Sequence, residues 1–378
     1  MAGFAVMGWC PGALRPMMSG DGLVVRVRPL GGRLTQSQAA GLAAAAQAHG
    51  NGLIDLSARG NVQLRGVTEA THGPLIDDLR AFDLIDTDAQ AEARRNVLVT
   101  PFADAGTDDL AARLGQALRD APALPAKFGF ALDCGPAPVM QNIAADIRLE
   151  RAADGGLILR CDGAEFGARV SAAEAPARAV ALAQWFVDAG GVTDGGGRMA
   201  ALIRRGVMPV GALAGTVLPA KALAAPGPGL VPQGALVGFA FGQMQAATFA
   251  ALAALGDLRV TPWRMLLIEQ ARQIPDLPEL ILTPDDPLRR IVACTGKPGC
   301  LQAQQPVRDL ARRLAPHVPQ GRLLHVSGCA KGCANPSRAD VTLVGTAQGF
   351  DLIRAGCAQD EPEVNGLRAT AILAKGPF

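Results

Sequence analysis

The chain lacks the marks of a secreted, membrane-bound or nucleic-acid-binding protein. Its N-terminal stretch MAGFAVMGWCPGALRP has no basic residue before a short apolar run that proline and glycine interrupt, unlike a secretory signal. The longest uncharged stretch, residues 222–256, is broken by prolines and glutamines into pieces shorter than the roughly 20 apolar residues of a spanning helix. A net charge of +2 is too mild for a nucleic-acid binder. We therefore expect a cytoplasmic protein with no nucleic-acid or membrane partner.

Histidine is also scarce. The chain has four histidines, His49, His72, His317 and His325, and their spacing does not suggest the facial triad of a mononuclear iron site. His325 lies four residues before a cysteine, but a lone histidine beside a strand is more often an ordinary hydrogen-bonded residue than a ligand.

What the chain does have is enough apolar sequence for several folding units. With 378 residues, 49% of them hydrophobic, it is too long for one ordinary domain, so two to four units are expected. Thiols stay reduced in the cytoplasm, so closely grouped cysteines indicate a metal or catalysis rather than disulfides.

The order of predicted elements occurs twice. A strand at residues 23–28 precedes a helix that Thr35 caps, with Gln38 at the capping-box position, and that ends at Gly50; strands follow at 53–56 and 62–65. After the Pro/Gly-rich joint at 225–232 comes a strand, LVGFAFG, a helix, and a returning strand region, LRVTPWRMLLI.

The next segments of the two halves also correspond. RRNVLVTP matches RRIVACTGKPGC, and KFGFALDCG matches LLHVSGCAKGC, which places Cys134 where Cys329 lies. Chance could produce this order in any α/β chain, but the paired arginines, Arg94–Arg95 and Arg289–Arg290, favour a true repeat. We predict an α+β fold made of two homologous halves, with half-domains at 15–80 and 228–278 and larger domains at 88–222 and 284–378.

Four of the eight cysteines lie close together in the second half. Cys294 and Cys300 form C-x5-C, Cys329 and Cys333 form C-x3-C, and 28 residues separate the pairs. Four thiolates can ligate a [4Fe-4S] cluster, and the small residues around them let backbone amides approach its sulfurs. Structural zinc uses tighter pairs. Four unrelated buried thiols are the remaining alternative.

These cysteine motifs resemble those of the nitrite and sulfite reductase superfamily, and the two-half organisation does so over nearly the whole chain. SARGNVQLRGV, RRNVLVTP and LPAKFGF are similar to its arginine- and lysine-bearing segments. The resemblance implies that the four cysteines hold a [4Fe-4S] cluster and that Arg59, Arg95 and Lys127 line the facing pocket. A second lysine normally follows two residues after the first, where this chain has Gly129, which argues against reduction of a small anion.

Longer strings resemble the precorrin-3B synthase family: GWCPGALRPMMSGDGLVVRVRP, NGLIDLSARGNVQLRGV and HVSGCAKGCANP. That resemblance implies an oxidoreductase of aerobic cobalamin biosynthesis, a monooxygenase that places oxygen from O2 at C20 of precorrin-3A while an acetate closes a γ-lactone. It also implies an electron donor, which the sequence does not identify, and a mononuclear non-haem iron, whose ligands stay open. Sirohaem is not expected, and a monomer is the default.

A tetrapyrrole with carboxylate groups around its periphery is expected to be bound by basic side chains. The candidate substrate-binding residues are Arg15, Arg26, Arg28, Arg59, Arg65, Arg95 and Lys127. Each could instead be a surface charge. Arg26 and Arg28 share one face of a strand and could act together on one carboxylate.

Two other functions stay open. One is a short sirohaem-dependent nitrite or sulfite reductase; the other is a non-catalytic iron–sulfur electron carrier or tetrapyrrole-binding protein. Among the remaining cysteines, Cys10 is expected in a structural turn, and Cys134, Cys161 and Cys357 are expected to be packed or free thiols.

Overall fold

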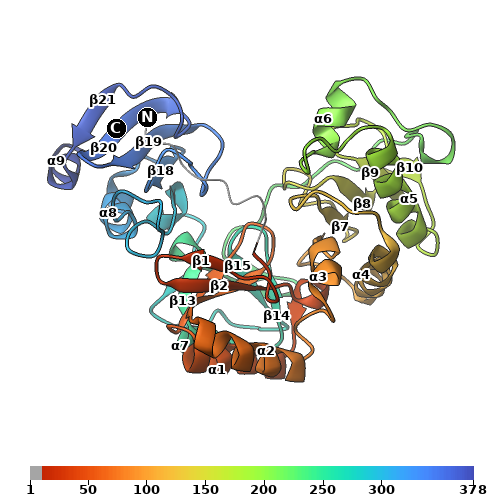
Figure 1. Cartoon of the computed structure of the whole chain (residues 1–378), viewed down its shortest axis with the longest axis horizontal. Helices are drawn as coiled ribbons and strands as arrows, with labels where there is room; N and C mark the ends of the chain where they lie inside the picture. Colours follow the sequence, from red (N-terminus) through yellow and green to blue (C-terminus); the bar gives the residue numbers. More distant parts are fainter. Residues whose placement is uncertain (1–10) are drawn as a thin grey trace.

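A computed structural model describes residues 11–378, so Cys10 lies outside the described residues. Two lobes lie on opposite sides of a central body, and the chain passes from the central body to one lobe, back, and then to the other lobe (Figure 1). Each part combines a β-sheet with helices. The expected α+β class is confirmed.

The central body contains one five-stranded and one six-stranded sheet. The first has the order β1-β2-β5-β4-β13, with bounds Met17–Ser19, Gly22–Val27, Val62–Val67, Leu53–Leu56 and Gln243–Gln245. The second has the order β11-β12-β15-β14-β3, with bounds Gly229–Val231, Gly234–Phe239, Met265–Glu269, Leu258–Val260 and Arg33–Leu34. A short strand, β16 (Leu280–Ile281), also pairs with β12.

Each central sheet takes one strand from the other half of the chain. β13 pairs with β4, placing Met244 opposite Ile54, and β3 pairs with β14, placing Leu34 opposite Leu258. The predicted half-domain ranges follow the order of the chain, whereas each sheet combines strands from both ranges. Because neither sheet is complete without the other half, the two halves form one structural body.

Helices cover one face of this body and share its core. They are α1 Gln36–His49, α2 Glu69–Ala81 and α7 Ala246–Ala253. The capping box predicted at Thr35 and Gln38 is confirmed, as is the end of α1 at Gly50. One apolar cluster, which includes Leu42, Ile54 and Phe249, joins residues of both halves.

The first lobe follows α3 (Ala89–Arg94) and has the sheet order β10-β9-β8-β7-β6. These strands are Ala168–Arg169, Leu157–Cys161, Ile147–Arg151, Phe130–Asp133 and Val97–Val99. Its helices are α4 Ala105–Ala117, α5 Ala175–Asp188 and α6 Met199–Arg204.

The second lobe has the sheet order β17-β18-β19-β20-β21. These strands are Ile291–Ala293, Leu324–Ser327, Ala339–Thr346, Gly349–Gly356 and Val364–Leu367. Its helices are α8 Arg308–Leu314 and α9 Ala369–Lys375.

The lobes repeat the same parallel pairing. β6 runs parallel to β7 with Val97 opposite Phe130, and β17 runs parallel to β18 with Ile291 opposite Leu324. In both pairs the partner lies 33 residues further along the chain (97 to 130 and 291 to 324). The equal spacing supports the repeat that the paired arginines indicate.

The segment LRVTPWRMLLI differs from its prediction as one returning strand region. It forms a hairpin of β14 and β15, whose turn includes Pro262 and ends at Arg264 with a φ of +59°. Proline has no amide hydrogen for the strand ladder, which favours a break at this point. The hairpin corresponds to β4 and β5 in the first half.

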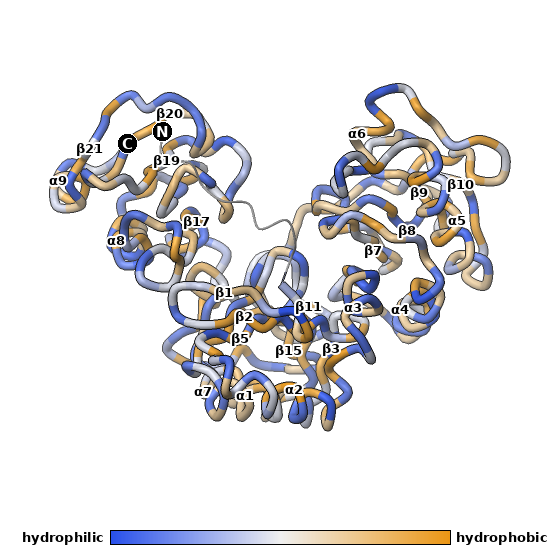
Figure 2. The backbone as a smooth tube through the Cα atoms, viewed as in Figure 1, coloured by the Kyte–Doolittle hydropathy of each residue, from blue (hydrophilic) through white to orange (hydrophobic). Residues whose placement is uncertain are grey.

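Hydrophobic and hydrophilic segments alternate along the chain (Figure 2). Within residues 11–378, no helix is long and apolar enough to cross a membrane.

Candidate metal centre and its cationic surroundings

The four cysteines of interest lie at one edge of the second lobe. Cys294 directly follows β17, and Cys329 comes two residues after the end of β18. Because these neighbouring strands are parallel, their carboxyl ends meet at the same edge of the sheet. Cys300 and Cys333 lie on the loops that continue from there. The fold therefore brings both cysteine pairs together.

Electrostatic coupling shows that the thiols are near one another. Burial raises the pKa of Cys333, and negative charge on Cys294, Cys329 and Cys300 raises it further, whereas Lys331 lowers it. Burial also raises the pKa of Cys294, but the backbone amides of Gly328 and Gly296 favour its thiolate. The Gly328 amide donates to Cys294 Sγ at 3.1 Å. Four thiolates in such a place need positive charge between them, which iron would supply.

The described residues contain no group of three or more His, Cys, Asp or Glu side chains placed to hold a single metal ion. A [4Fe-4S] cluster requires a different arrangement of ligands. Each thiolate binds a different iron atom, so the four sulfurs need not converge on one point. Four coupled thiols on two loops, with a backbone amide already directed at one sulfur, fit that arrangement.

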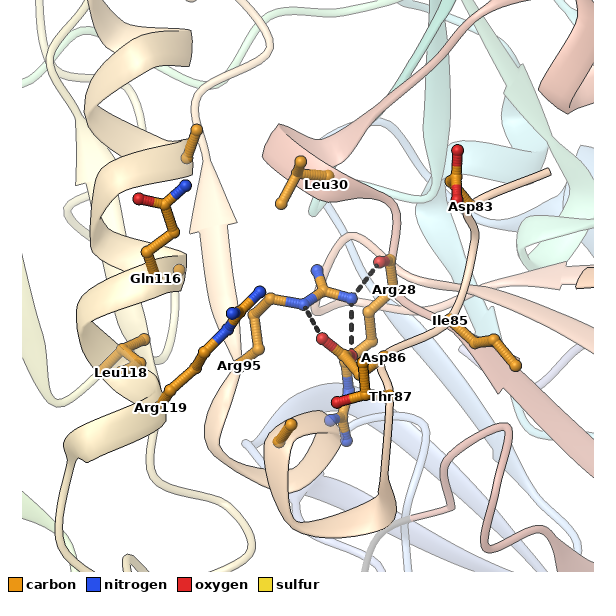
Figure 3. Close-up of a pocket in the computed structure, with 13 residues that line it drawn as sticks. Arg28, Leu30, Asp83, Ile85, Asp86, Thr87, Arg95, Gln116, Leu118 and Arg119 are labelled. Carbon is orange, nitrogen blue, oxygen red and sulfur yellow. Dashed lines mark hydrogen bonds and ion pairs between the residues drawn. The ribbon is translucent and has the colours of Figure 1, made fainter. Parts of the chain in front are cut away.

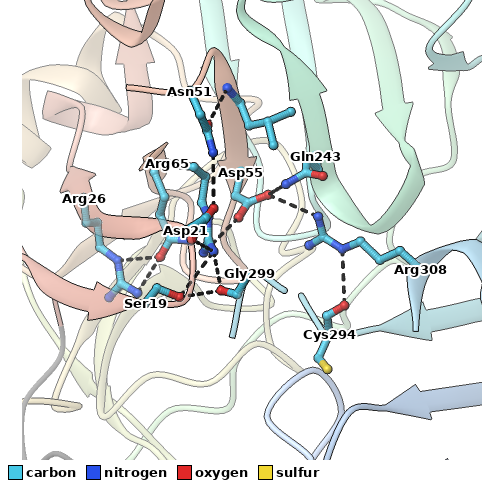
Figure 4. Close-up of polar contacts among 12 residues, drawn as sticks. Ser19, Asp21, Arg26, Asn51, Asp55, Arg65, Gln243, Cys294, Gly299 and Arg308 are labelled. Atoms are coloured by element: carbon cyan, nitrogen blue, oxygen red, sulfur yellow. Dashed lines mark hydrogen bonds and ion pairs between the residues drawn. The ribbon is translucent and has the colours of Figure 1, made fainter. Parts of the chain in front are cut away.

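The loop between Cys294 and Cys300 docks on the first central sheet. The Gly299 carbonyl oxygen accepts hydrogen bonds from Ser19 Oγ at 2.6 Å and from Arg65 Nη2 at 2.8 Å (Figure 4). The Gly20 amide also donates to it, at 3.3 Å. Gly20 allows this approach, because a Cβ there would lie 2.0 Å from the Pro298 carbonyl oxygen.

A buried carboxylate, Asp55, lies beneath this docked loop. It is 3.6 Å from Arg65 Nη1 and 3.7 Å from Arg308 Nη1, and it accepts a hydrogen bond from Gln243 at 2.8 Å. Arg308 also donates to the Cys294 carbonyl oxygen at 3.2 Å. Burial lowers the pKa of Arg308, and Asp55 opposes that shift. The network thus connects the central sheet to both ends of the C-x5-C loop.

Three of the predicted substrate-binding arginines are engaged by the protein itself. Arg65 is 4% exposed and binds both carboxylate oxygens of Asp21, in addition to Gly299. Arg95 forms a bidentate pair with Asp86, at 2.8 and 2.9 Å. Arg28 is buried and donates to the Glu92 carbonyl oxygen. These contacts make Arg28, Arg65 and Arg95 parts of the structural frame.

Arg28 and Arg95 line a cavity of about 250 Å³ between the central body and the first lobe. Figure 3 shows Arg95 with its guanidinium on Asp86 and on the Arg28 carbonyl oxygen, which it reaches at 3.0 Å. Arg119 lines the same cavity from beside α4.

The other predicted cations are more accessible. Arg26 is half-buried and binds Gln63 Oε1 at 2.7 and 3.1 Å, and Arg59 donates to the Lys127 carbonyl oxygen at 3.1 Å. The Lys127 and Arg15 residues are exposed. Arg59, from the central body, and Lys127, from the first lobe, therefore lie in contact.

The remaining cysteines differ from the grouped ones. Cys134 and Cys161 are buried in the first lobe, and burial raises the pKa of each to about 12. The Cys134 thiol donates to the Leu149 carbonyl oxygen at 3.4 Å. Both are packed thiols, as predicted, and Cys357 is a free thiol.

Sequence reasoning missed three polar residues around the cysteine loops: Asp55, Arg264 and Arg308. Asp55 alternates with buried residues in a strand, a pattern that ordinarily marks the solvent face. Arg308 lies in α8, and Arg264 lies in the turn between β14 and β15, where the sequence predicts one continuous strand region. A charged residue opposite a docked loop gives no local signal of its partner.

Comparison with known proteins bears on the whole chain. Residues 15–82 match the nitrite/sulfite reductase ferredoxin-like half-domain. The chain is 30% identical to a precorrin-3B synthase of a Sinorhizobium species, over 94% of this chain and 84% of the relative. Its fold is similar to that of the Mycobacterium tuberculosis NirA protein, with a TM-score of 0.63 and 21% identity, over 89% of this chain and 74% of NirA. The expected superfamily fold is confirmed.

Proposed function

Because the chain belongs to the precorrin-3B synthase family, we propose that it is an oxidoreductase of aerobic cobalamin biosynthesis that converts precorrin-3A into precorrin-3B. The reaction is a monooxygenation: one atom of O2 enters at C20, the other leaves as water, and a donor supplies two electrons. The acetate of ring A then closes a γ-lactone. The observation that carries the proposal is the similarity to a precorrin-3B synthase over 94% of the chain.

The cofactor proposed for the second lobe is a [4Fe-4S] cluster held by Cys294, Cys300, Cys329 and Cys333. It would supply single electrons at this edge of the sheet. The Gly328 amide, directed at Cys294 Sγ, would stabilise negative charge on that sulfur. A mononuclear iron is also proposed for O2, but the described residues offer no ligand set for it, so no residue is assigned to that role.

Within this proposal the accessible cations bind the substrate's carboxylates. Lys127 and Arg15 are exposed, and Arg26 and Arg59 are half-buried, so part of each residue is accessible to a ligand. Guanidinium groups bind carboxylates through two parallel hydrogen bonds, which fixes orientation as well as affinity. Binding at several points around the macrocycle would hold C20 in one position relative to the reacting oxygen.

The Gly129 backbone supports a synthase over a reductase of small anions. A Cβ at Gly129 would lie 2.7 Å from Asn96 Nδ2, and that amide donates to the Phe128 carbonyl oxygen at 2.8 Å. The second lysine found in the reductases would therefore displace Asn96. Without it, the site has one fewer cation for binding and protonating a small anion.

Aerobic turnover tests the proposed function. Protein reconstituted anaerobically with iron and sulfide is given precorrin-3A and a chemical electron donor, with and without O2. We expect a product heavier by one oxygen atom only when O2 is present, and no sirohaem bands in the protein. Unchanged precorrin-3A, together with sirohaem bands and turnover of sulfite or nitrite, would refute the synthase assignment. Binding of precorrin-3A without turnover would indicate a non-catalytic protein.

A further inference from the structure

We propose that a second pocket, beside Arg264, binds one carboxylate side chain of the tetrapyrrole substrate. The inference rests on the proposed function for the identity of the ligand. The pocket has a volume of about 180 Å³ and lies where the second half of the central body meets the second lobe. Its walls combine apolar side chains with two guanidinium groups, and they include Phe239, Phe241, Trp263, Met265, Arg264 and Arg289.

Arg264 has no acidic partner within salt-bridge distance in the described part of the chain. Its Nη2 donates a hydrogen bond to the Ala334 carbonyl oxygen, and this bond is long, at 3.3 Å. Arg259, on the same hairpin, instead binds both Asp108 and Glu269 at 2.7 to 2.9 Å. A guanidinium that lines a cavity with most of its donors unused is suited to binding an anion.

The electrostatic surroundings of Arg264 favour an anion as well. Burial lowers the pKa of Arg264, and the positive charge of Arg308 lowers it further, with Asp55 only partly opposing them. An anionic ligand would relieve both effects, because it would pair with the guanidinium and offset the repulsion between the two arginines.

The pocket lies against the cysteine loops. Ala334, which accepts from Arg264, directly follows Cys333, and Arg308 donates to the Cys294 carbonyl oxygen. A carboxylate on Arg264 would therefore place part of the ligand near the loop that carries Cys333. That position is consistent with a macrocycle held next to the proposed cluster.

The backbone at Arg264 is shaped for this placement. Its φ of +59° lies in the left-handed region, which residues other than glycine rarely adopt. Gly242 makes room for it, because a Cβ at Gly242 would lie 2.9 Å from the Cβ of Arg264. Such strained positions occur mostly at ligand-binding sites.

His325 is a second, independent indication that a water or ligand binds here. It is fully buried, and neither ring nitrogen has a hydrogen-bond partner among residues 11–378. It is paired with Val292 in the parallel β17–β18 ladder, and Val292 lines the pocket. Paired residues of neighbouring strands lie on the same face of the sheet, so the imidazole lies on the same face as the Val292 side chain. Buried orphaned polar atoms of this kind point to a bound water or ligand.

The chemistry of the walls selects the ligand. A small inorganic anion would use the guanidinium groups but would make no use of the apolar walls formed by Phe239, Phe241 and Trp263. A pyrrole ring edge that carries an acetate or propionate would satisfy both the charge and the apolar walls. A free inorganic oxyanion and a tetrapyrrole carboxylate could both bind the guanidinium groups. Only the tetrapyrrole carboxylate, with its pyrrole ring, would also contact the apolar walls.

Binding of uroporphyrin I, a tetrapyrrole with acetate and propionate groups on every ring, tests the inference without requiring turnover. The holoprotein is titrated anaerobically with this probe, and the dissociation constant is measured by fluorescence anisotropy. We expect Arg264→Gln to weaken binding about 10- to 100-fold, from the loss of one charge-assisted pair. Arg264→Lys keeps the charge without the bidentate geometry and should give a smaller loss. The matched control is Arg80→Gln, an exposed arginine on α2, which should bind like the wild type.

The outcomes separate the two proposals. If the wild type binds uroporphyrin I and both Arg264 variants bind it equally well, the carboxylate pocket is wrong while the proposed function stands. If the wild type binds no tetrapyrrole at all, both fail. Full competition by inorganic phosphate at concentrations comparable to the probe would assign the pocket to a free anion and overturn the inference. Cluster absorption confirms the fold of each variant, and Arg264→Lys carries the test if Arg264→Gln does not fold.

Discussion

The Arg65 guanidinium donates to the Gly299 carbonyl oxygen, 2.8 Å away, although 234 positions separate the two residues in the chain. Gly299 directly precedes Cys300, and Arg65 lies in the first half. The arginine that the sequence suggests as a substrate ligand thus holds a cysteine loop of the second half in place. The proposed cluster and the first central sheet are therefore one structural unit.

Replacing Arg65 tests this connection. Arg65→Leu removes the guanidinium that pairs with Asp21 and one of the two that face Asp55, and breaking a buried pair costs about 3–5 kcal/mol. We expect the free energy of unfolding in urea to fall by that amount and the iron bound per protein after reconstitution to decrease. Arg80→Leu, at an exposed pair with Asp77, should change stability by less than about 1 kcal/mol. Normal iron content in Arg65→Leu would show that the loop does not depend on this contact.

A single methyl group should disturb the same docking. A Cβ at Gly20 meets the Pro298 carbonyl oxygen at 2.0 Å, so Gly20→Ala must displace the loop before Cys300. We expect lower iron content and a changed cluster absorption spectrum. Gly73→Ala is the matched control, because nothing lies within 4 Å of a Cβ there and alanine in a helix gains about 0.5–1 kcal/mol. Equal spectra for Gly20→Ala and the wild type would contradict the docking.

The eight cysteines should divide into two classes. Cys300→Ser should abolish most of the iron–sulfur absorption, because serine replaces the thiolate that one iron requires. Cys357→Ser, at a half-buried free thiol outside both pairs, should leave the absorption unchanged. Iron and sulfide analysis of both variants checks this division. Equal loss in the two variants would refute the assignment of ligands.

His325 should make the protein sensitive to acid. Burial, and then the charge of Arg264, lowers its pKa from 6.5 to about 4. As the pH falls below 6.5, the unfolded chain takes up a proton that the folded protein refuses. The contribution of His325 to the free energy of unfolding is therefore fully present above pH 6.5. It falls by about 3 kcal/mol as the pH decreases towards 4. The free energy of unfolding of His325→Leu, measured over the same pH range, should not show this decrease.

Asp133 provides a control of opposite sign. Burial raises its pKa from 3.8 to about 6, so the folded state holds a proton that the unfolded state releases. Stability from this group is present below pH 3.8 and is lost as the pH rises through about 6. Asp133→Asn should therefore steepen the acid loss of stability, whereas His325→Leu should reduce it. Identical pH profiles for the two variants would contradict both assignments.

Much of the fold could be predicted from the sequence because its signals are local or repeated. The capping box at Thr35 and Gln38 and the glycine at position 50 define α1 from residues within one turn of its ends. The exchange of β3 and β13 between the sheets could not be predicted in the same way. Strands of two and three residues carry almost no periodicity, and their pairing depends on the other half of the chain.

The site divides along the same line. The spacing of the cysteines suggests one centre, and the parallel strands β17 and β18 place the two pairs at one edge. The role of a cation, in contrast, depends on which acid faces it. Arg95 and Arg65 lie within motifs that suggest a substrate pocket, but Asp86 and Asp21 occupy their guanidinium groups. Arg264, in a turn that the sequence does not predict, makes one long hydrogen bond within the part of the chain that the structure describes.

Turnover under ¹⁸O₂ tests the central claim most directly. Reconstituted protein is given precorrin-3A and an electron donor in ¹⁸O₂ and ordinary water, and the product is analysed by mass spectrometry. The account predicts one ¹⁸O atom in the product, because the oxygen at C20 comes from O2 and the lactone oxygen comes from the substrate's own acetate. A product that gains its oxygen from water, or precorrin-3A recovered unchanged by protein with a complete cluster, would contradict it.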